Sequence, residues 1–167
     1  FAALKDDGSV VTWGSSKWGG DSSNINSSLT NVSKIYSTAG AFAALKEDGS
    51  VVAWGLEARG GNSSSVSSSL SSGVSHIYST FYAFAALKED GSVITWGLEE
   101  RGGDSSSVDI SSGINQIYSN RQAFAALKED GSVVTWGGAS YGGDSSSISS
   151  SLSSDVVGFS YPFTNDI

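Results

Sequence analysis

The residues that could do chemistry in this chain are carboxylates that return at regular intervals. Acidic pairs stand at positions 6–7, 47–48, 89–90 and 129–130. Carboxylate oxygens suit calcium, and two carboxyl groups about 5 to 9.5 Å apart in a pocket would suit glycoside hydrolysis. Each pair is followed directly by glycine, however, and an Asp-Gly step is typical of a tight hairpin turn. We therefore expect these acids to form turns, and an enzyme with a carboxylate site in a central channel is the weaker alternative.

Other reactive groups are scarce. His76 is the only histidine and the chain has no cysteine, so the sequence offers neither a repeated catalytic triad nor ligands for zinc or iron. Asp21, Asn62, Asp104 and Asp144 each follow a pair of glycines, and we expect their side chains to cap their own loops as Asx turns. The sequence predicts no catalytic residue, no metal site and no cofactor, and hence a protein that is not an enzyme.

One fourteen-residue phrase positions these groups. It reads FAALKDDGSVVTWG from Phe1 and recurs, with three variable positions, from Phe42, Phe84 and Phe124 at spacings of 41, 42 and 40 residues. Self-similarity at such a period indicates a repeat architecture. We expect a single repeat domain spanning 1–167, with repeats at approximately 1–41, 42–83, 84–123 and 124–167.

Each repeat is expected to form a small antiparallel sheet. The runs FAAL and VVTW flank the Asp-Gly turn and predict a hairpin whose glycine has a positive φ. The IYS run before the next FAAL predicts a third strand, and both faces of the main strands are apolar, so each sheet must be covered on both sides. A weaker fourth strand is expected around Ile25, Val66, Val108 and Ile148.

Sheets that their own copies cover on both faces are typical of a β-propeller. We therefore expect an all-β fold, a β-propeller of four short repeat blades, with an open β-solenoid-like stack as the alternative. Residues 156–161 lie where other copies have IYS, but no further FAAL follows them. We expect this segment to pair with residues 1–4 and close the ring. Two alternatives are that these four blades belong to a longer chain, or that two chains together form eight blades.

The repeated phrase resembles the regulator of chromosome condensation repeat, and the match covers essentially the whole chain. The resemblance implies a propeller. These units are shorter than that family's repeats, Gly-Gly-Asp/Asn-Ser replaces Gly-Gln-Leu-Gly, and four copies stand in place of seven, as in the short, near-identical bacterial version. The family's guanine-nucleotide exchange activity depends on features outside the phrase, and no residue here inherits it. In the second copy the matching positions are Ala44, Leu45, Asp48, Gly49, Val51, Trp54 and Gly55.

Composition narrows the range of partners. A net charge of −8 leaves no basic face for nucleic acid, and no stretch approaches the ~18 apolar residues of a membrane-inserted span. The lack of cysteine is compatible with export, and an extracellular or cell-surface location is favoured. Because the chain begins within a repeated phrase, we expect a piece of a longer protein, with further repeats of the same chain or a homo-oligomer as its neighbours.

Two clusters differ between copies while the rest is repeated. One follows Trp-Gly and the other precedes Phe-Ala-Ala-Leu. Because the hairpin reverses the chain, both clusters should lie at the same end of the blade, and they are rich in the aromatic and arginine side chains that dominate binding hot spots. The expected ligand-binding residues are Lys17, Trp18, Arg59, Phe81, Tyr82, Arg101, Arg121, Tyr141 and Phe163.

These patterns favour a non-enzymatic recognition or adhesion module whose variable loop face binds a protein or a glycan. The alternative is a structural spacer or surface-array domain of a larger repeat protein, which serine-rich, acidic and near-identical repeats also suit.

Overall fold

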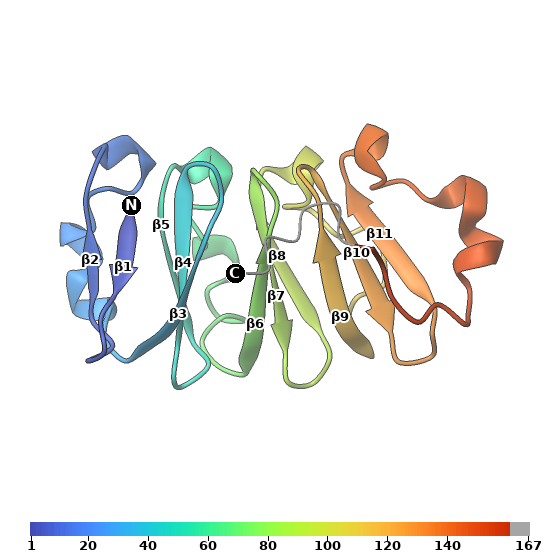
Figure 1. The fold of residues 1–167 in the computed structure, drawn as a ribbon, viewed down its shortest axis with the longest axis horizontal. Coiled ribbons are helices and arrows are strands. Elements are labelled where there is room, and N and C mark those ends of the chain that lie inside the picture. The colour runs from blue at the N-terminus through green and yellow to red at the C-terminus, as the bar shows by residue number, and fades with distance from the viewer. Residues whose placement is uncertain (161–167) are drawn as a thin grey trace.

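The computed structural model describes residues 1–160 and contains four small antiparallel sheets that stand side by side (Figure 1). We call them blades 1 to 4 in chain order. Blade 1 has β1 (Ala2–Leu4) and β2 (Val10–Thr12). Blade 2 has β3 (Val32–Ser37), β4 (Ala41–Lys46) and β5 (Val51–Gly55); blade 3 has β6 (Val74–Ser79), β7 (Ala83–Lys88) and β8 (Val93–Gly97); blade 4 has β9 (Ile114–Ser119), β10 (Ala123–Lys128) and β11 (Val133–Gly137).

The hairpins form as the sequence predicts. In blade 2, Leu45 of β4 pairs with Val51 of β5, and the turn between them is closed by a hydrogen bond from the Gly49 N–H to the Lys46 carbonyl at 3.0 Å. Gly49 has φ +74°, and a Cβ there would lie 2.8 Å from the backbone nitrogen of Gly73. The turn therefore requires glycine both for its backbone conformation and for the close approach of the next linker.

The predicted IYS strand is also confirmed, and it shows how the blades divide the sequence. Ile35 of β3 pairs with Ala44 of β4, in the register repeated by β6 with β7 and by β9 with β10. In blades 2 to 4 the first strand thus comes from the end of one sequence repeat, and the other two come from the start of the next.

The expected fourth strand is wrong, because the serine-rich linkers form 3-10 turns. Ser-rich segments bond to their own backbone and so compete with a sheet ladder; the Asn62 Oδ1 accepts a hydrogen bond from the Ser64 N–H at 2.9 Å. Ile25, Val66 and Ile148 lie in η2 (Ser23–Ser28), η4 (Ser64–Val66) and η7 (Ser146–Leu152), and Val108 lies in a bend.

No helix within residues 1–160 is long and apolar enough to cross a membrane.

Apolar cores lie between the blades, so the inner sheets are covered on both faces as expected. β3, β6 and β9 approach one another directly, while the linkers fill the space between the outer parts of adjacent sheets. Leu70 of the linker after β5 is 1% exposed and packs between blades 2 and 3. Its carbonyl accepts a hydrogen bond from the Val51 N–H at 2.9 Å, so the linker holds to its own blade while it fills the gap to the next.

In blades 2 to 4, a tryptophan links the blade to the one before it. The indole Nε1 of Trp96 donates to the Gly60 carbonyl at 3.0 Å, and the same bond joins Trp54 to Gly19 at 3.0 Å and Trp136 to Gly102 at 3.2 Å. Phe84 stacks on Trp96 in the following blade, and a Cβ at Gly60 would lie 2.6 Å from the Phe84 ring. Only glycine therefore lets this aromatic pair pack against the preceding blade.

The expected ring closure is not found among residues 1–160. β1 pairs with β2 alone, and blades 1 and 4 lie at opposite ends of the row (Figure 1). Residues 156–160 instead lie against blade 4, where the ring of Phe159 is 4.6 Å from that of Tyr118. The rest of the expected closing strand, at Tyr161, lies outside the described residues.

Candidate functional site

The segments that differ between repeats gather along one edge of the row. The short helices η1 (Ser16–Trp18), η3 (Glu57–Arg59), η5 (Glu99–Arg101) and η6 (Ala139–Tyr141) follow the last strand of each blade. They lie along the upper edge in Figure 1, opposite the hairpin turns. The turns before β4, β7 and β10 reach the same edge, and we call these turns and the four helices together the rim.

One hydroxyl or amide side chain per blade fixes each rim turn. Thr80 Oγ1 accepts hydrogen bonds from the N–H groups of Tyr82 and Ala83 at 3.1 and 3.0 Å. It also donates to the carbonyl of Arg101 at 3.1 Å, which ties the turn to η5. Thr38 makes the equivalent bond to the Arg59 carbonyl at 2.9 Å, and Asn120 to the Tyr141 carbonyl at 2.7 Å.

Backbone hydrogen bonds then join the rim turns from blade to blade. The Ala39 N–H donates to the Phe81 carbonyl at 3.1 Å, and the Phe81 N–H donates to the Arg121 carbonyl at 2.9 Å. These bonds can form with any side chain except proline, which has no backbone N–H to donate. The rim is therefore a continuous scaffold on which neighbouring side chains are held in register.

Arg59 is the centre of a stack that crosses from blade 1 to blade 3. Its guanidinium lies 4.6 Å from the ring centroid of Tyr82 and 5.4 Å from that of Trp18. Such geometry gives a favourable cation–π contact on each side. Gly40 packs against this stack, and only glycine fits there, because a Cβ would lie 2.4 Å from the Trp18 ring. Lys17 lies 5.9 Å from the Trp18 centroid and extends the stack.

A second stack continues the row towards blade 4. The guanidinium of Arg121 lies 5.1 Å from the ring centroid of Phe81, and the ring of Phe81 lies 6.0 Å from that of Tyr82. Arg101 reaches across to blade 4, where its guanidinium would be 3.2 Å from a Cβ at Gly138. The chain's three arginines, Arg59, Arg101 and Arg121, therefore all lie on the rim.

The structure brings eight of the nine expected binding residues to the rim. Trp18, Phe81 and Tyr141 are 41%, 46% and 42% exposed, Lys17 and Arg121 are exposed, and Arg59, Tyr82 and Arg101 are half-buried. The ninth, Phe163, lies outside the described residues.

Sequence reasoning missed the residues that hold the rim together. Thr38, Thr80 and Asn120 precede the variable pair in each copy and were available as a recurring hydrogen-bonding position. Gln122 gives no such signal, since it stands where other copies have glycine and tyrosine. It is 6% exposed, and its Oε1 has no hydrogen-bond partner within residues 1–160.

The acidic side chains of the opposite edge are engaged in turns. Asp48 Oδ1 accepts hydrogen bonds from the Ser50 hydroxyl and N–H at 2.6 and 2.9 Å, and these bonds hold the pKa of Asp48 below its usual value. The expected Asx turns also form: Asp104 Oδ1 accepts from the Ser106 N–H at 2.8 Å. Within the described part of the chain no three acidic or histidine side chains converge as a metal site would require.

The fold and its repeated blades define an all-β protein of the propeller class, and the prediction of four short blades is confirmed. Human WBSCR16 is similar, with a TM-score of 0.50 and 19% identity over 81% of this chain and 44% of that chain. Prp20p from Saccharomyces cerevisiae has a TM-score of 0.46 and 20% identity over 64% and 30% of the two chains. For the computationally designed Ika8 the values are 0.43 and 15% over 81% and 42%.

This chain thus spans less than half the length of each of these three structures. At 19% identity, the likeness to WBSCR16 shows the fold and nothing about activity. No family model matches the sequence, and no curated protein matches it.

Proposed function

We propose that the rim is a recognition or adhesion surface that binds a protein or a glycan, and that the chain is not an enzyme. The observation that carries this proposal is the row of stacked arginine and aromatic side chains at positions that vary between otherwise copied repeats. Three cation–π contacts, of Arg59 with Trp18 and Tyr82 and of Arg121 with Phe81, order these side chains before any ligand arrives.

Pre-ordered side chains suit binding because less rotamer entropy remains to be lost. The exposed faces of Trp18 and Tyr141 offer flat apolar surface for a sugar ring or an apolar side chain. Guanidinium groups add donors in a planar fork for carbonyl or carboxylate oxygens. Glu57, Glu99 and Glu100 on the same short helices give the rim both signs of charge, which favours a specific ligand over any polyanion.

Screening the chain against a printed glycan array and a panel of immobilised extracellular proteins tests the proposal directly. For any ligand found, Trp18→Ala combined with Arg121→Ala should weaken binding by at least about tenfold, the loss typical of hot-spot contacts. Glu89→Gln, on the opposite edge, is the control and should leave affinity unchanged. Loss of binding in the control, or full binding by the rim variant, would place the ligand elsewhere.

A structural spacer or array domain is the second candidate. It is favoured by the near-identity of the repeats, whose fourteen-residue segment varies at only three positions, and by their serine-rich, acidic composition. Absence of any ligand in both screens would leave this function as the better account.

A further inference from the structure

The arginines of the rim are unpaired, unlike two lysines at the hairpin turns. Within residues 1–160 their guanidinium groups form no ion pair, and none of their side-chain N–H groups donates a hydrogen bond. By contrast, Lys5 and Lys128 lie 3.4 and 3.5 Å from the carboxylates of Asp7 and Asp109. Each guanidinium offers five N–H donors. The rim therefore holds donors for an anionic group that the described part of the chain does not use.

The stacks hold two of these guanidinium groups so that their N–H edges stay open. That of Arg59 lies over the rings of Trp18 and Tyr82, and that of Arg121 lies over Phe81. A guanidinium that stacks on a ring uses its flat face, while its N–H groups point outward around its edge. Such an edge matches a carboxylate, whose two oxygens accept two parallel hydrogen bonds. Stacking also fixes the fork in advance and so reduces the entropy lost on binding.

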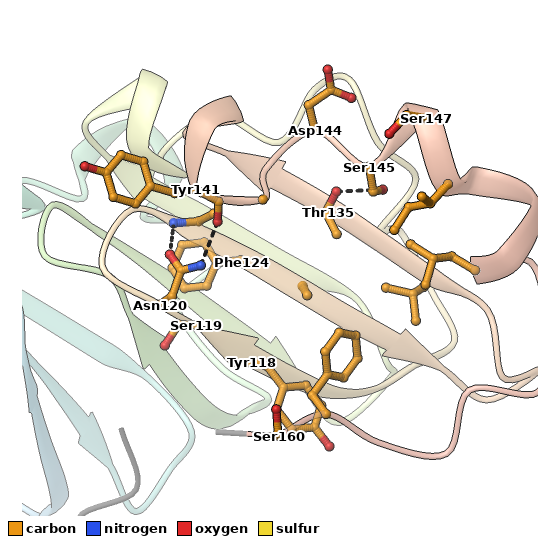
Figure 2. Close-up of a pocket in the computed structure, with 17 residues that line it drawn as sticks. Tyr118, Ser119, Asn120, Phe124, Thr135, Tyr141, Asp144, Ser145, Ser147 and Ser160 are labelled. Carbon is orange, nitrogen blue, oxygen red and sulfur yellow. Dashed lines mark hydrogen bonds between the residues drawn. The ribbon is translucent and has the colours of Figure 1, made fainter. Parts of the chain in front are cut away.

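The backbone of the rim is poorly suited to binding a peptide strand. Strand addition uses main-chain N–H and carbonyl groups along an open edge. On the rim, the N–H groups of Ala39 and Phe81 already donate to carbonyls of neighbouring turns. A carbonyl is used in a similar way at blade 4, where Asn120 Nδ2 donates to the Tyr141 carbonyl at 2.7 Å (Figure 2). Because these main-chain groups serve the rim itself, a ligand must be recognised by the rim's side chains.

A polar recess adjoins the rim between blades 2 and 3. Its volume is about 470 Å³, and Glu57 and Glu99 line it from η3 and η5, with Asn62 and Thr95 among its other lining residues. The indole of Trp96 also lines it, but that side chain is 3% exposed and bonded to the preceding blade. Carboxylates, an amide and a hydroxyl can accept hydrogen bonds from sugar hydroxyls or donate to them. The recess thus suits a sugar better than the apolar side chain that anchors a protein partner.

We propose that the ligand of the rim is a glycan whose sugar units carry carboxylate groups, as in a polymer of uronic acids. This inference rests on the proposed binding function of the rim and names its ligand class. The carboxylates of the glycan bind the N–H edges of Arg59 and Arg121. The hydroxyl groups of a sugar bind in the recess, where Glu57 and Glu99 accept their hydrogen bonds. Both signs of charge on the rim are then used.

The charges of the molecule select against more densely charged polymers. The rings of Tyr82 and Phe81 lie between the two stacked arginines, so the guanidinium groups match single charges spaced along a chain. The glutamates of η3 and η5 and the net charge of −8 repel a ligand with many charges, such as a sulfated glycan or a nucleic acid. A glycan with one carboxylate on each sugar, or on every second sugar, meets both conditions.

Carboxyl reduction of defined oligosaccharides tests the ligand class. The probes are hexasaccharides of galacturonic acid and of hyaluronan, each intact and with its carboxyl groups reduced to alcohols, and binding is measured by titration calorimetry. At least one intact probe should bind, and reduction should weaken its binding by at least about tenfold, because the guanidinium groups lose their charged acceptors. No binding of either intact probe, equal binding of the reduced forms, or tighter binding of a heparin hexasaccharide or of hexaglutamate would each overturn the inference. If the wider screens then find a neutral glycan or a protein at the rim, the proposed function still stands.

Conservative variants locate the site on the rim. Arg59→Lys and Arg121→Lys keep the positive charge but remove the planar fork, so each should weaken binding of the intact probe by at least about tenfold. Arg121 is exposed, so its variant remains informative if the Arg59 variant is found by circular dichroism to be misfolded. Lys5→Gln, at the opposite edge, is the control and should bind normally. Unchanged affinity in the folded rim variants would contradict the proposed function as well as this inference.

Glu99→Ala tests the recess, because the two possible roles of this carboxylate predict opposite results. If Glu99 accepts a sugar hydroxyl, its removal weakens binding of the intact probe, although a negative charge is lost. If it only repels the anionic ligand, its removal strengthens binding. Weaker binding supports the recess as a sugar site, and stronger or unchanged binding would overturn that part of the inference and leave the proposed function of the rim in place.

Discussion

At the residue scale, the acidic side chains of this chain act inside turns. Asp7 accepts hydrogen bonds from the hydroxyl and the N–H of Ser9, and these bonds lower the pKa of Asp7 to about 2. The pKa of Asp130 is lowered in the same way by Ser132. Each bond favours the carboxylate, so the native turn stabilises the charged form over the protonated one.

Stability should therefore fall in acid. An aspartate in the unfolded chain has a pKa of about 3.9, and the folded pKa is lower, so the stabilisation is complete above pH ~4 and is lost as the pH falls through the folded value. For Asp7 that window runs from pH ~4 to about 2. We expect the thermal midpoint, followed by circular dichroism, to be level above pH 5 and to drop below pH ~4.

A triple variant isolates the turn carboxylates. Asp48→Asn, Asp90→Asn and Asp130→Asn together retain the accepting oxygen, as Asn62 does in its own turn, but remove the titration. The decrease of the thermal midpoint below pH ~4 should become smaller in this variant. Glu47→Gln, Glu89→Gln and Glu129→Gln form the matched control beside them, and an equal flattening in that control would contradict the assignment.

Turn chemistry could be read from the sequence because it is local: an Asp-Gly step and a following serine sit within a few residues of each other. The contacts of Arg59 could not, because they join residues from different blades. Which aromatic ring lies above a guanidinium depends on the rotation between blades, and that rotation cannot be derived from the spacing of residues in the sequence.

At the scale of the element, the serine-rich linker is the part whose secondary structure was predicted wrongly from the sequence. Its two apolar anchors resemble a short strand, but its serines and Asx turns form 3-10 turns that wedge between blades. The hairpins and the IYS strands were predictable because the short apolar, β-prone runs and the Asp-Gly turns between them agree. The linker's buried anchors were predictable as docked residues, although not as a helix.

Leu70 and Leu152 provide a matched test of that wedge. Leu70→Ala should lower the free energy of unfolding by about 2–5 kcal/mol, the range for a buried leucine whose cavity cannot collapse fully. Leu152 occupies the equivalent position after blade 4, is only half-buried, and should cost less when changed to alanine. Urea unfolding followed by tryptophan fluorescence measures both, and equal losses would mean that the linker does not depend on the following blade.

Thr80 allows a test of how the rim turn is held. Thr80→Val keeps the shape but leaves the N–H groups of Tyr82 and Ala83 without their acceptor in a buried site. Unsatisfied buried groups cost about 1–3 kcal/mol, so the urea midpoint should fall. Thr80→Ser retains the hydroxyl and serves as the control, and a loss as large as that of the valine variant would argue against the hydrogen bond as the cause.

At the scale of the whole molecule, the blades form a quasi-one-dimensional row in which each contacts only its neighbours. The number of blades could be predicted from the number of sequence repeats, and the blades stand in the row in the order of the repeats along the chain. The closure of the ring was a prediction that the described residues do not bear out, because curvature arises from many small packing differences and not from the count of copies.

Protection of backbone amides should follow the row. Blade 3 has apolar cores on both sides, whereas blade 1 has one. We expect hydrogen exchange, measured by mass spectrometry, to be slowest in β7 and faster in β1 and β2, because end units open with less loss of contact. Uniform protection across all blades would indicate a single cooperative unit or an association that covers both ends.

The main-chain bonds that join residues 39, 81 and 121 separate the folding of this chain from the diversity of its surface. The carbonyl and N–H groups there hold the turns in place whatever group is attached to each Cα. A combinatorial library that randomises these three positions should therefore yield mostly folded proteins. Gene duplication followed by drift would, by the same route, produce new binding specificities without disturbing the scaffold that displays them.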